Sequence, residues 1–418
     1  MWTFGCTSIK IFLGVTLKGE KMSDLIIRNA LTRKTGGDQV DIAIKDGKIV
    51  EIKEKISDKG SEEIDAKGNL VTESFVNGHL HLDKVYTLDR AGQKAIEEYN
   101  DGGMSNALSS IASAAEFKSE YNEKWIIENV RKALDLAVKF GNTHIRAFAD
   151  VDSKAKLEGV KALLKAKEEY KDKVTLEVVA FPQDGIAREP GAYEYVEESL
   201  KLGADVVGGI PWIEFTREDE QDHVDKMCDL AKKYNKDISM LCDDVGDPEE
   251  RTFEMLIKKV LEMGWYGRAT GQHCRAMMLY PENQFRKLCT LLKKAKMGVI
   301  SDPQTGPLHA RVQDLIKEGI PVGLGQDDIN DAYYTFGQNN MLEVAFLGAH
   351  LLRMCSDKDL ELVYDMITNM AGKVLNMKGH ELTVGGNADL VVLKEKDVKH
   401  AIWYHEEPVK VIKNGKII

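Results

Sequence analysis

The stretch SFVNGHLHLD, residues 74–83, joins a short apolar run to two histidines that are one residue apart. An apolar run that ends in polar residues is typical of a buried β-strand reaching the edge of a sheet. Residues two apart on a strand point the same way, so His79 and His81 should project together. Two imidazoles placed like this can bind one transition-metal cation. The stretch therefore predicts the first strand of a sheet with a metal site at its carboxyl edge.

Seven more short apolar stretches come later in the chain, and helical stretches separate them. In the helical stretch 122–141, apolar residues recur at three- and four-residue spacing, and Gly141 marks its end. Eight strand–helix units predict an α/β fold, a distorted TIM (β/α)8 barrel over residues 76–375. The seven further strands are expected at residues 143–151, 174–182, 204–211, 237–244, 268–274, 296–302 and 320–328.

Both ends of the chain show a different pattern of short alternating strands. Residues 22–75 contain the turn sequence KDGK, and residues 376–418 contain the turn sequence KNGK. Asp-Gly and Asn-Gly between alternating apolar residues favour tight β-hairpins. We expect the two ends to form one small β-sandwich domain. Residues 1–21 precede a second methionine, Met22, and we expect them to be a leader or the product of a mis-assigned start.

Composition limits the classes of partner. The net charge of -11 and the scattered 57 Lys and Arg residues argue against nucleic acid or an anionic membrane as partner. No apolar run approaches the roughly 20 residues of a membrane span. The six cysteines form no CxxC pair, which favours free thiols in a reducing cytoplasm over disulfides.

Polar residues gather at the expected carboxyl ends of the strands, where TIM barrels carry their chemistry. This position predicts an active site there. The residues are His79, His81, Asp150, Asp152, Gln183, Glu214, Asp243, Asp244, His273, Asp302, Asp327 and Asp328.

Several of these stretches resemble the cytosine deaminase branch of the amidohydrolase superfamily. They are HLHLDK (79–84), VVAFPQDGI (178–186), LGADVVGGIPWIEFTRE (202–218), GQHCRAM (271–277) and GQDDINDAYYTFGQNNMLEV (325–344). The resemblance spans nearly all of residues 24–418. It implies one divalent metal ion, zinc or iron, bound by His79, His81 and Asp327.

The resemblance also implies three catalytic roles. His273 would stabilise the transition state or polarise the attacking water. Asp327 would accept a proton from that water, and Asp244 would carry a proton to the leaving nitrogen.

Residues that would contact the substrate come from other strand ends. Gln183 would read the edge of the ring, with Asp328 beside it. Trp212, Tyr333 and Phe336 are candidates for aromatic walls, although single aromatics are more often core or rim.

The chain departs from the family pattern at the metal site. Leu241 occupies the position of a ligand histidine, Asp244 replaces a glutamate, Phe148 replaces a histidine, and Gln326 replaces another. Three ligands still suffice for a catalytic zinc, so we expect a metal that is bound weakly. Strand alternation turns Cys242 outward if Leu241 faces inward, but a bulge would make Cys242 a ligand instead.

These observations predict a metal-dependent hydrolytic deaminase of a small, cytosine-like nitrogen heterocycle that releases ammonia. Two alternatives remain open: hydrolysis of another cyclic amide or C–N bond, and a non-catalytic barrel that binds a heterocycle. The resemblance and the apolar stretch 340–354 also suggest a homo-oligomer.

Overall fold

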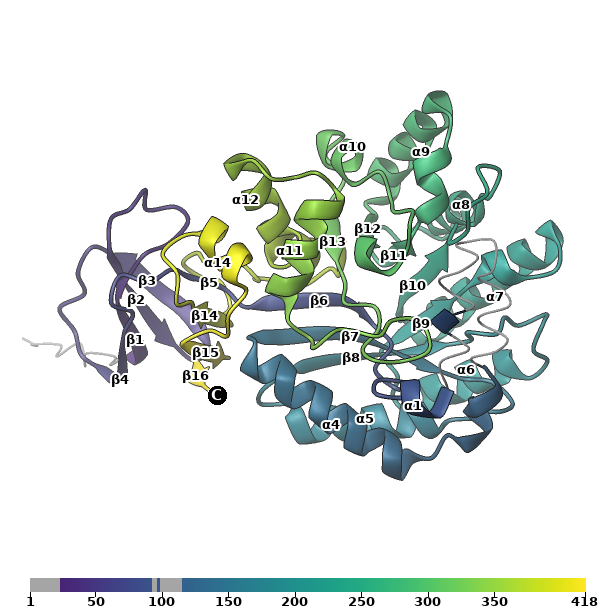
Figure 1. The fold of residues 1–418 in the computed structure, drawn as a ribbon, viewed down its shortest axis with the longest axis horizontal. Helices are drawn as coiled ribbons and strands as arrows, with labels where there is room; N and C mark the ends of the chain where they lie inside the picture. The colour runs from purple at the N-terminus through teal and green to yellow at the C-terminus, as the bar shows by residue number, and fades with distance from the viewer. Residues whose placement is uncertain (1–22, 92–95, 98–114) are drawn as a thin grey trace, which may run out of the picture.

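The computed structural model describes residues 23–91, 96–97 and 115–418. The expected leader, residues 1–21, lies outside the described residues. Figure 1 shows a large barrel of strands and helices with a small β-domain at one end. The C-terminus lies in that small domain, beside strands from the start of the chain.

The barrel sheet has eight strands in the order in which they occur in the chain, and every neighbouring pair is parallel. This arrangement confirms the predicted TIM barrel. Its strands are β6 (Phe75–Leu80), β7 (Asn142–Asp150), β8 (Thr175–Phe181), β9 (Val206–Gly209), β10 (Asp237–Cys242), β11 (Ala269–His273), β12 (Gly298–Ser301) and β13 (Val322–Leu324).

The last and first strands meet just past the end of β13. The backbone N–H of Asp327 donates to the carbonyl of His79 at 2.9 Å, and the N–H of His81 donates to the carbonyl of Asp327 at 2.8 Å. Leu80 and Asp327 thereby form a parallel bridge. The closure of the barrel therefore places Asp327 directly beside both histidines.

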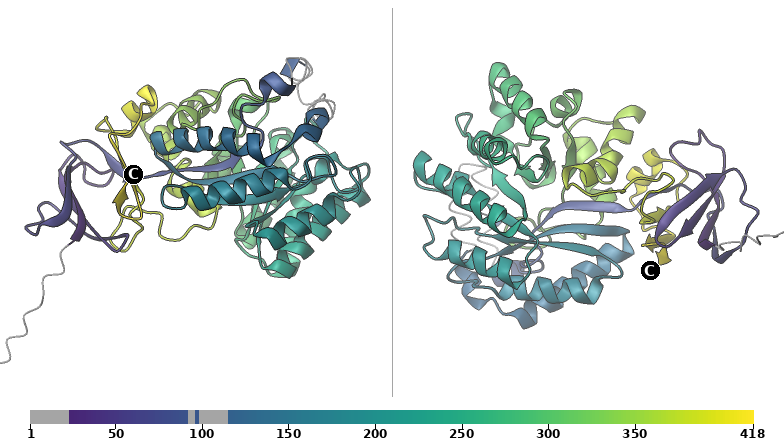
Figure 2. Two further views of the ribbon diagram at one scale, coloured as in Figure 1. Left: turned by 90° about the horizontal axis from the view of Figure 1, so that it is seen from below. Right: turned by 180° about the vertical axis from the view of Figure 1, so that it is seen from behind.

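Helices cover the outside of this sheet, as Figure 2 shows from two further sides. In α4 the Asn122 side chain accepts from the N–H of Lys124 at the start, and Gly141, with φ 74°, comes after the end, as the sequence predicted. No helix in the described ranges is long and apolar enough to cross a membrane. The helices are α1 (Leu88–Ala91), α4 (Glu123–Lys139), α5 (Glu158–Tyr170), α6 (Ala192–Leu202), α7 (Arg217–Tyr234), α8 (Thr252–Met263), α9 (Glu282–Ala295), α10 (Val312–Lys317), α11 (Met341–Leu351), α12 (Asp357–Asp365), α13 (Asn369–Val374) and α14 (Val398–Tyr404), with 3₁₀ turns at Glu116–Glu120, Pro211–Ile213, Arg275–Leu279 and Pro303–Thr305.

Two four-stranded sheets form the small domain, with orders β3-β2-β1-β4 and β16-β15-β14-β5. Residues from both chain ends share one core, including Leu25, Ile42, Val71, Leu390 and Ile412. The predicted sandwich of both termini is therefore confirmed. The strands are β1 (Ser23–Ala30), β2 (Val40–Lys45), β3 (Lys48–Lys53), β4 (Gly60–Asp65), β5 (Val71–Glu73), β14 (Leu390–Val392), β15 (Lys410–Lys413) and β16 (Lys416–Ile417).

The two predicted hairpin turns join β2 to β3 and β15 to β16. Both central residues of each turn have positive φ: 50° and 71° at Asp46 and Gly47, and 49° and 77° at Asn414 and Gly415. Asp-Gly and Asn-Gly suit this backbone because their side chains tolerate it.

The apolar stretch 340–354 forms α11, and most of its apolar side chains are buried within the chain itself, as at Met341, Leu342 and Val344. The apolar residues of this helix suggested an oligomer, but most of them are explained by packing within the chain. Assembly stays a prediction.

Ile412→Ala should test whether the C-terminal strands are needed for the stability of the sandwich. Ile412 is fully buried in the shared core, so the change should lower the free energy of unfolding by about 2–5 kcal/mol. Val409→Ala, at a side chain that is 48% exposed, is the matched control and should change it by less than about 0.5 kcal/mol. Denaturant titrations of both variants measure this, and equal effects would contradict a shared core.

Candidate active site

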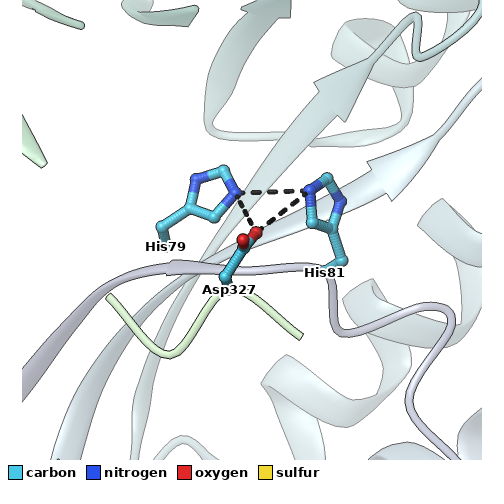
Figure 3. A group of neighbouring side chains, drawn as sticks. All are labelled: His79, His81 and Asp327. Atoms are coloured by element: carbon cyan, nitrogen blue, oxygen red, sulfur yellow. Dashed lines mark hydrogen bonds and ion pairs between the residues drawn. The ribbon is translucent and has the colours of Figure 1, made fainter. Parts of the chain in front are cut away.

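Three side chains converge at the carboxyl end of the barrel (Figure 3). His79 Nε2 lies 3.3 Å from His81 Nε2 and 3.2 Å from Asp327 Oδ1, and His81 Nε2 lies 3.7 Å from the same oxygen. The three ligand atoms all lie within 4.8 Å of one another. His79 lies near the end of β6 with its imidazole inside the barrel, and His81 comes two residues later on the same side.

These residues fit a divalent cation with an open coordination position. All three are buried, and burial lowers the pKa of His81 well below its usual value, which keeps the imidazole in the neutral form that binds metals. Thr305 Oγ1 donates to Asp327 Oδ2 at 2.7 Å, so that Oδ1 faces the two imidazoles. The donor set of two nitrogens and one carboxylate oxygen suits zinc or iron.

The structure places Leu241 inside the barrel and Cys242 outside it. Leu241 belongs to an apolar cluster with Phe148, Phe181 and Trp212. Cys242 packs in the main core instead. Burial raises the pKa of its thiol well above the usual range. No bulge interrupts the pairing of β10 with β11, so the register provides no route for Cys242 to the metal position.

His273 ends β11, and its ring lies 4.8 Å from the His79 ring, next to the same carboxylate. Its Nε2 is 3.7 Å from Asp327 Oδ1, and its Nδ1 is 3.3 Å from Asp302 Oδ2. Burial lowers the pKa of His273 to about 4, so the imidazole is neutral near pH 7. Asp302, at the end of β12, therefore backs the imidazole on the side opposite to Asp327.

Asp244, just after the end of β10, is paired with an arginine. Its Oδ1 forms an ion pair with Arg275, whose other nitrogen donates to Thr305 at 2.8 Å and lies 3.8 Å from Asp327 Oδ2. Arg275 and Thr305 were not predicted as site residues. The only sequence signal for Arg275 was its place two residues after His273, and Thr305 lies in a turn that shows no periodic pattern.

Gln183 lies in a network of buried charges that the sequence did not reveal. Lys84 Nζ is 3.1 Å from Gln183 Oε1 and 3.1 Å from both oxygens of Asp150. Lys118, in the 3₁₀ turn Glu116–Glu120, contacts Asp150 at 2.9 Å and Asp152 at 3.1 Å. Lys84 was visible in the HLHLDK stretch, whereas nothing in the sequence brought Lys118 to this place.

The remaining residues that were predicted to contact the substrate differ in their burial and in their neighbours. Asp328 is buried, and burial together with Asp327 and Asp331 raises its pKa well above the usual range. The Tyr333 ring lies 5.6 Å from Lys84 Nζ. Trp212 is buried in the apolar cluster with Leu241, and its Nε1 has no hydrogen-bond partner in the described part of the chain. Phe336 is 68% exposed, as expected of a rim residue.

Glu214 anchors the loop that comes after Gln183. Its carboxylate accepts from the backbone N–H groups of Ile186, Ala187 and Arg188 at 2.7–3.3 Å. His223 Nδ1 lies 2.7 Å from Glu214 Oε1, and its Nε2 accepts from the N–H of Ile210. Because Nε2 is an acceptor, the ring proton is on Nδ1 and the neutral histidine donates to Glu214. Glu214, which follows the turn Pro211–Ile213, is thus a structural residue.

Comparisons with known proteins agree with this geometry. A model of the Amidohydrolase family matches residues 62–418. N-isopropylammelide isopropyl amidohydrolase from Pseudomonas sp. strain ADP is 33% identical over 398 residues, which cover 94% of this chain and 97% of the relative. The crystal structure of 5-methylcytosine deaminase from Klebsiella pneumoniae with 5-fluorocytosine superposes with a TM-score of 0.84 at 28% identity, covering 94% of this chain and 97% of that one. Pterin deaminase from Rhizobium rhizogenes is 22% identical over 401 residues, 91% of this chain and 88% of the relative.

The chain belongs to the amidohydrolase family. It is a hydrolytic enzyme that acts on non-peptide C–N bonds. The family uses a divalent metal, and the buried His79, His81 and Asp327 could hold one. The resemblance to cytosine deaminases inferred from the sequence is confirmed.

Leu241→His should strengthen metal binding. The new imidazole would replace an apolar side chain inside the barrel, and even outer contacts of a metal site are worth about ten-fold or more in affinity. Zinc retained after dialysis against a weak chelator should therefore rise at least about ten-fold, while His79→Ala should empty the site. Cys242→Ser is the control at the next strand position and should leave zinc retention unchanged. Loss of zinc in Cys242→Ser would show that the register is wrong.

Glu214→Gln should reveal how much the hydrogen bonds between Glu214 and the loop contribute to the free energy of unfolding. Burial raises the pKa of Glu214, but the hydrogen bonds from His223 and the backbone outweigh burial and leave it below its ordinary value of 4.5. The ionised anchor thus stabilises the fold above pH 4.5, and this contribution is lost as pH falls through the lowered pKa. At pH 7 the variant should lose about 1–3 kcal/mol of unfolding free energy, because its amide cannot accept all these bonds.

Unfolding curves of wild type and Glu214→Gln across pH 3–7 measure the anchor. The difference should shrink at acidic pH, and a difference that is constant with pH would contradict an ionised anchor. Glu218→Gln, on the exposed start of α7, is the matched control and should show no difference.

Proposed function

We propose that this protein is a metal-dependent hydrolase that removes an exocyclic amino group from a small, flat nitrogen heterocycle. The observation that carries the proposal is the convergence of His79 Nε2 and His81 Nε2 on Asp327 Oδ1, with His273 Nε2 3.7 Å from the same oxygen. The names of three relatives, an N-isopropylammelide amidohydrolase, a pterin deaminase and a 5-methylcytosine deaminase, all describe nitrogen heterocycles.

His79, His81 and Asp327 would hold one zinc or iron ion. A divalent ion in that position supplies Lewis acidity that lowers the pKa of water toward 7. Asp327 accepts the proton of the attacking water. His273, which is neutral, would donate a hydrogen bond from Nε2 to the negative charge that develops on the atoms bonded to the attacked carbon. Burial and the nearby Asp327 raise the pKa of Asp302 well above its usual value, so its protonated carboxyl would face the unprotonated Nδ1 of His273.

The other residues bind the ring and move the second proton. Asp244 carries that proton to the departing nitrogen on Oδ2, because Arg275 holds Oδ1. Gln183 contacts the edge of the ring, with Asp328 beside it and Tyr333 as a wall. Trp212 and Leu241 supply apolar surface next to His81 through Phe181, whose ring lies 5.5 Å from that imidazole.

Arg275 restrains the Asp244 carboxylate, which would otherwise be free to move. Because it links Asp244 to Thr305 and thereby to Asp327, it keeps the two carboxylates at fixed positions. We also propose a cytoplasmic homo-oligomer, on the basis of the free cysteines in the sequence and the partly exposed end of α11 at Leu351.

The zinc- or iron-loaded full chain should release ammonia, or an alkylamine, from a subset of amino- and alkylamino-substituted pyrimidines, triazines and pterins. His273→Ala should lower kcat by about 100-fold or more with its metal retained, since one donor to developing charge is worth about that much. His400→Ala, on the exposed face of α14, is the control and should keep full activity. A fully metal-loaded protein that binds these rings and releases no amine would contradict the proposal, whereas ring opening without amine release would identify a cyclic amidase.

A further inference from the structure

Asp243 is a buried acid that has no role in the proposed reaction. It follows β10 directly and comes one residue before Asp244, the proposed proton carrier. Its side chain is fully buried, and its backbone is left-handed, with φ 50°, which is uncommon for a residue other than glycine. A residue in such a conformation is found only where the surrounding structure holds it in place. The contacts of Asp243 therefore show what it holds together.

Three donors bind the Asp243 carboxylate. Oδ1 accepts from the hydroxyl of Thr252 at 2.8 Å and from the N–H of Phe253 at 2.9 Å, both at the start of α8. Oδ2 accepts from the hydroxyl of Tyr280, which also lies 2.9 Å from the carbonyl oxygen of Glu250. The carboxylate thereby connects the end of β10 to α8 on one side and to Tyr280 on the other.

The 3₁₀ turn Arg275–Leu279 begins with the arginine that pairs with Asp244, and it ends just before Tyr280. Near the start of this turn, the N–H of Ala276 donates to the backbone carbonyl of Asp243 at 2.8 Å. Asp243 thus contacts the turn at its start through its carbonyl and just past its end through its carboxylate. Because Asp243 is also the chain neighbour of Asp244, these two contacts set the spacing between the arginine and the Asp244 carboxylate.

We infer that Asp243 and Tyr280 are positioning residues, whose hydrogen bond fixes the ion pair of Asp244 and Arg275 at the place where Asp244 passes its proton to the departing nitrogen. They act through this ion pair and not through contact with the ring. A displacement of about 1 Å at a reacting group can lower a rate about 100-fold, so a small shift of the turn is enough to matter. The inference rests on the proposed function, because it takes Asp244 as the proton carrier.

Tyr280→Phe removes one hydroxyl and keeps the ring. Because the turn loses its hydrogen bond to Asp243, kcat for amine release by the zinc-loaded full chain should fall about ten-fold or more, with KM changed by less than about three-fold. Tyr266→Phe, at a tyrosine that is 51% exposed, is the matched control and should change neither constant.

Asp243→Asn should retain the activity that Asp243→Ala loses. The asparagine Nδ2 can donate to the oxygen of Tyr280, whose hydroxyl then donates to Glu250, and Oδ1 still accepts from the start of α8. In Asp243→Asn, kcat should therefore stay within about three-fold of the wild type, whereas Asp243→Ala should fall as far as Tyr280→Phe.

A double-mutant cycle separates positioning from a general loss of structure. Asp244→Asn should lower kcat about 100-fold or more, since it removes the proton carrier. If Tyr280 acts through Asp244, adding Tyr280→Phe to Asp244→Asn should lower kcat by less than about two-fold more. A merely structural effect would lower kcat by the same factor in both backgrounds, and that result would overturn the inference.

Crystal structures of the zinc-loaded variants give a readout that does not depend on activity. Asp243→Asn should keep the guanidinium of Arg275 within about 3 Å of Asp244 Oδ1, and Tyr280→Phe should lose this contact. An unchanged contact in Tyr280→Phe, or a wild-type kcat, would overturn the inference and leave the proposed function standing. If Tyr280→Phe does not fold, Asp243→Ala is judged by the same two criteria. Failure of the zinc-loaded wild type to release any amine would overturn both.

Discussion

Two backbone hydrogen bonds close the barrel and create the site. The N–H of Asp327 donates to the carbonyl of His79, and the N–H of His81 donates to the carbonyl of Asp327. This register leaves no freedom in where the Asp327 carboxylate lies, because a slip by one residue would turn its side chain to the opposite face. Asp327 takes a positive φ of 65° at this point, which is uncommon for a residue other than glycine. The fold thus accepts a strained residue at the position where the two ligand segments meet.

Around this junction the protein buries an unusual amount of charge. Lys84, Lys118 and Asp150 are nearly inaccessible to water, and so is Arg275. Buried charges cost free energy unless each is paired and hydrogen-bonded. Lys84 and Lys118 meet this condition on Asp150, and Arg275 meets it on Asp244 and Thr305. The pairs hold carboxylates and an amide in place around the proposed metal site. We infer that they position these groups rather than add net stability to the fold.

Several features could be predicted from the sequence because they depend on the periodicity of a strand or on a turn motif. Alternation along a strand placed His79 and His81 on one side, and it placed Leu241 inside and Cys242 outside, as the structure has them. The turn residues Asn414 and Gly415 predicted the C-terminal hairpin.

Residues contributed by loops and 3₁₀ turns could not be predicted in this way. Lys118 and Thr305 lie in no periodic pattern, and their contacts depend on the path of the chain between elements. The role of Glu214 was also beyond the sequence: it was expected at a strand end, but it follows the turn Pro211–Ile213 after β9 and binds backbone N–H groups instead of a ligand. Position at the carboxyl edge therefore indicated where the site is, and it did not separate residues that face a ligand from residues that hold a loop.

The position of the metal tests this account most directly. Anomalous diffraction at the zinc edge from crystals of the zinc-loaded protein should show one strong peak at about 2.0–2.2 Å from His79 Nε2, His81 Nε2 and an oxygen of Asp327. At the position where family members carry a further ligand histidine, the peak should face only the apolar side chain of Leu241. His81, Asp83 and Asp150 are a second buried group whose ligand atoms lie within 4.8 Å of one another. A peak bonded to Cys242 Sγ, or a peak at this second group with none at Asp327, would contradict the claim that barrel closure at residue 327 builds the metal site.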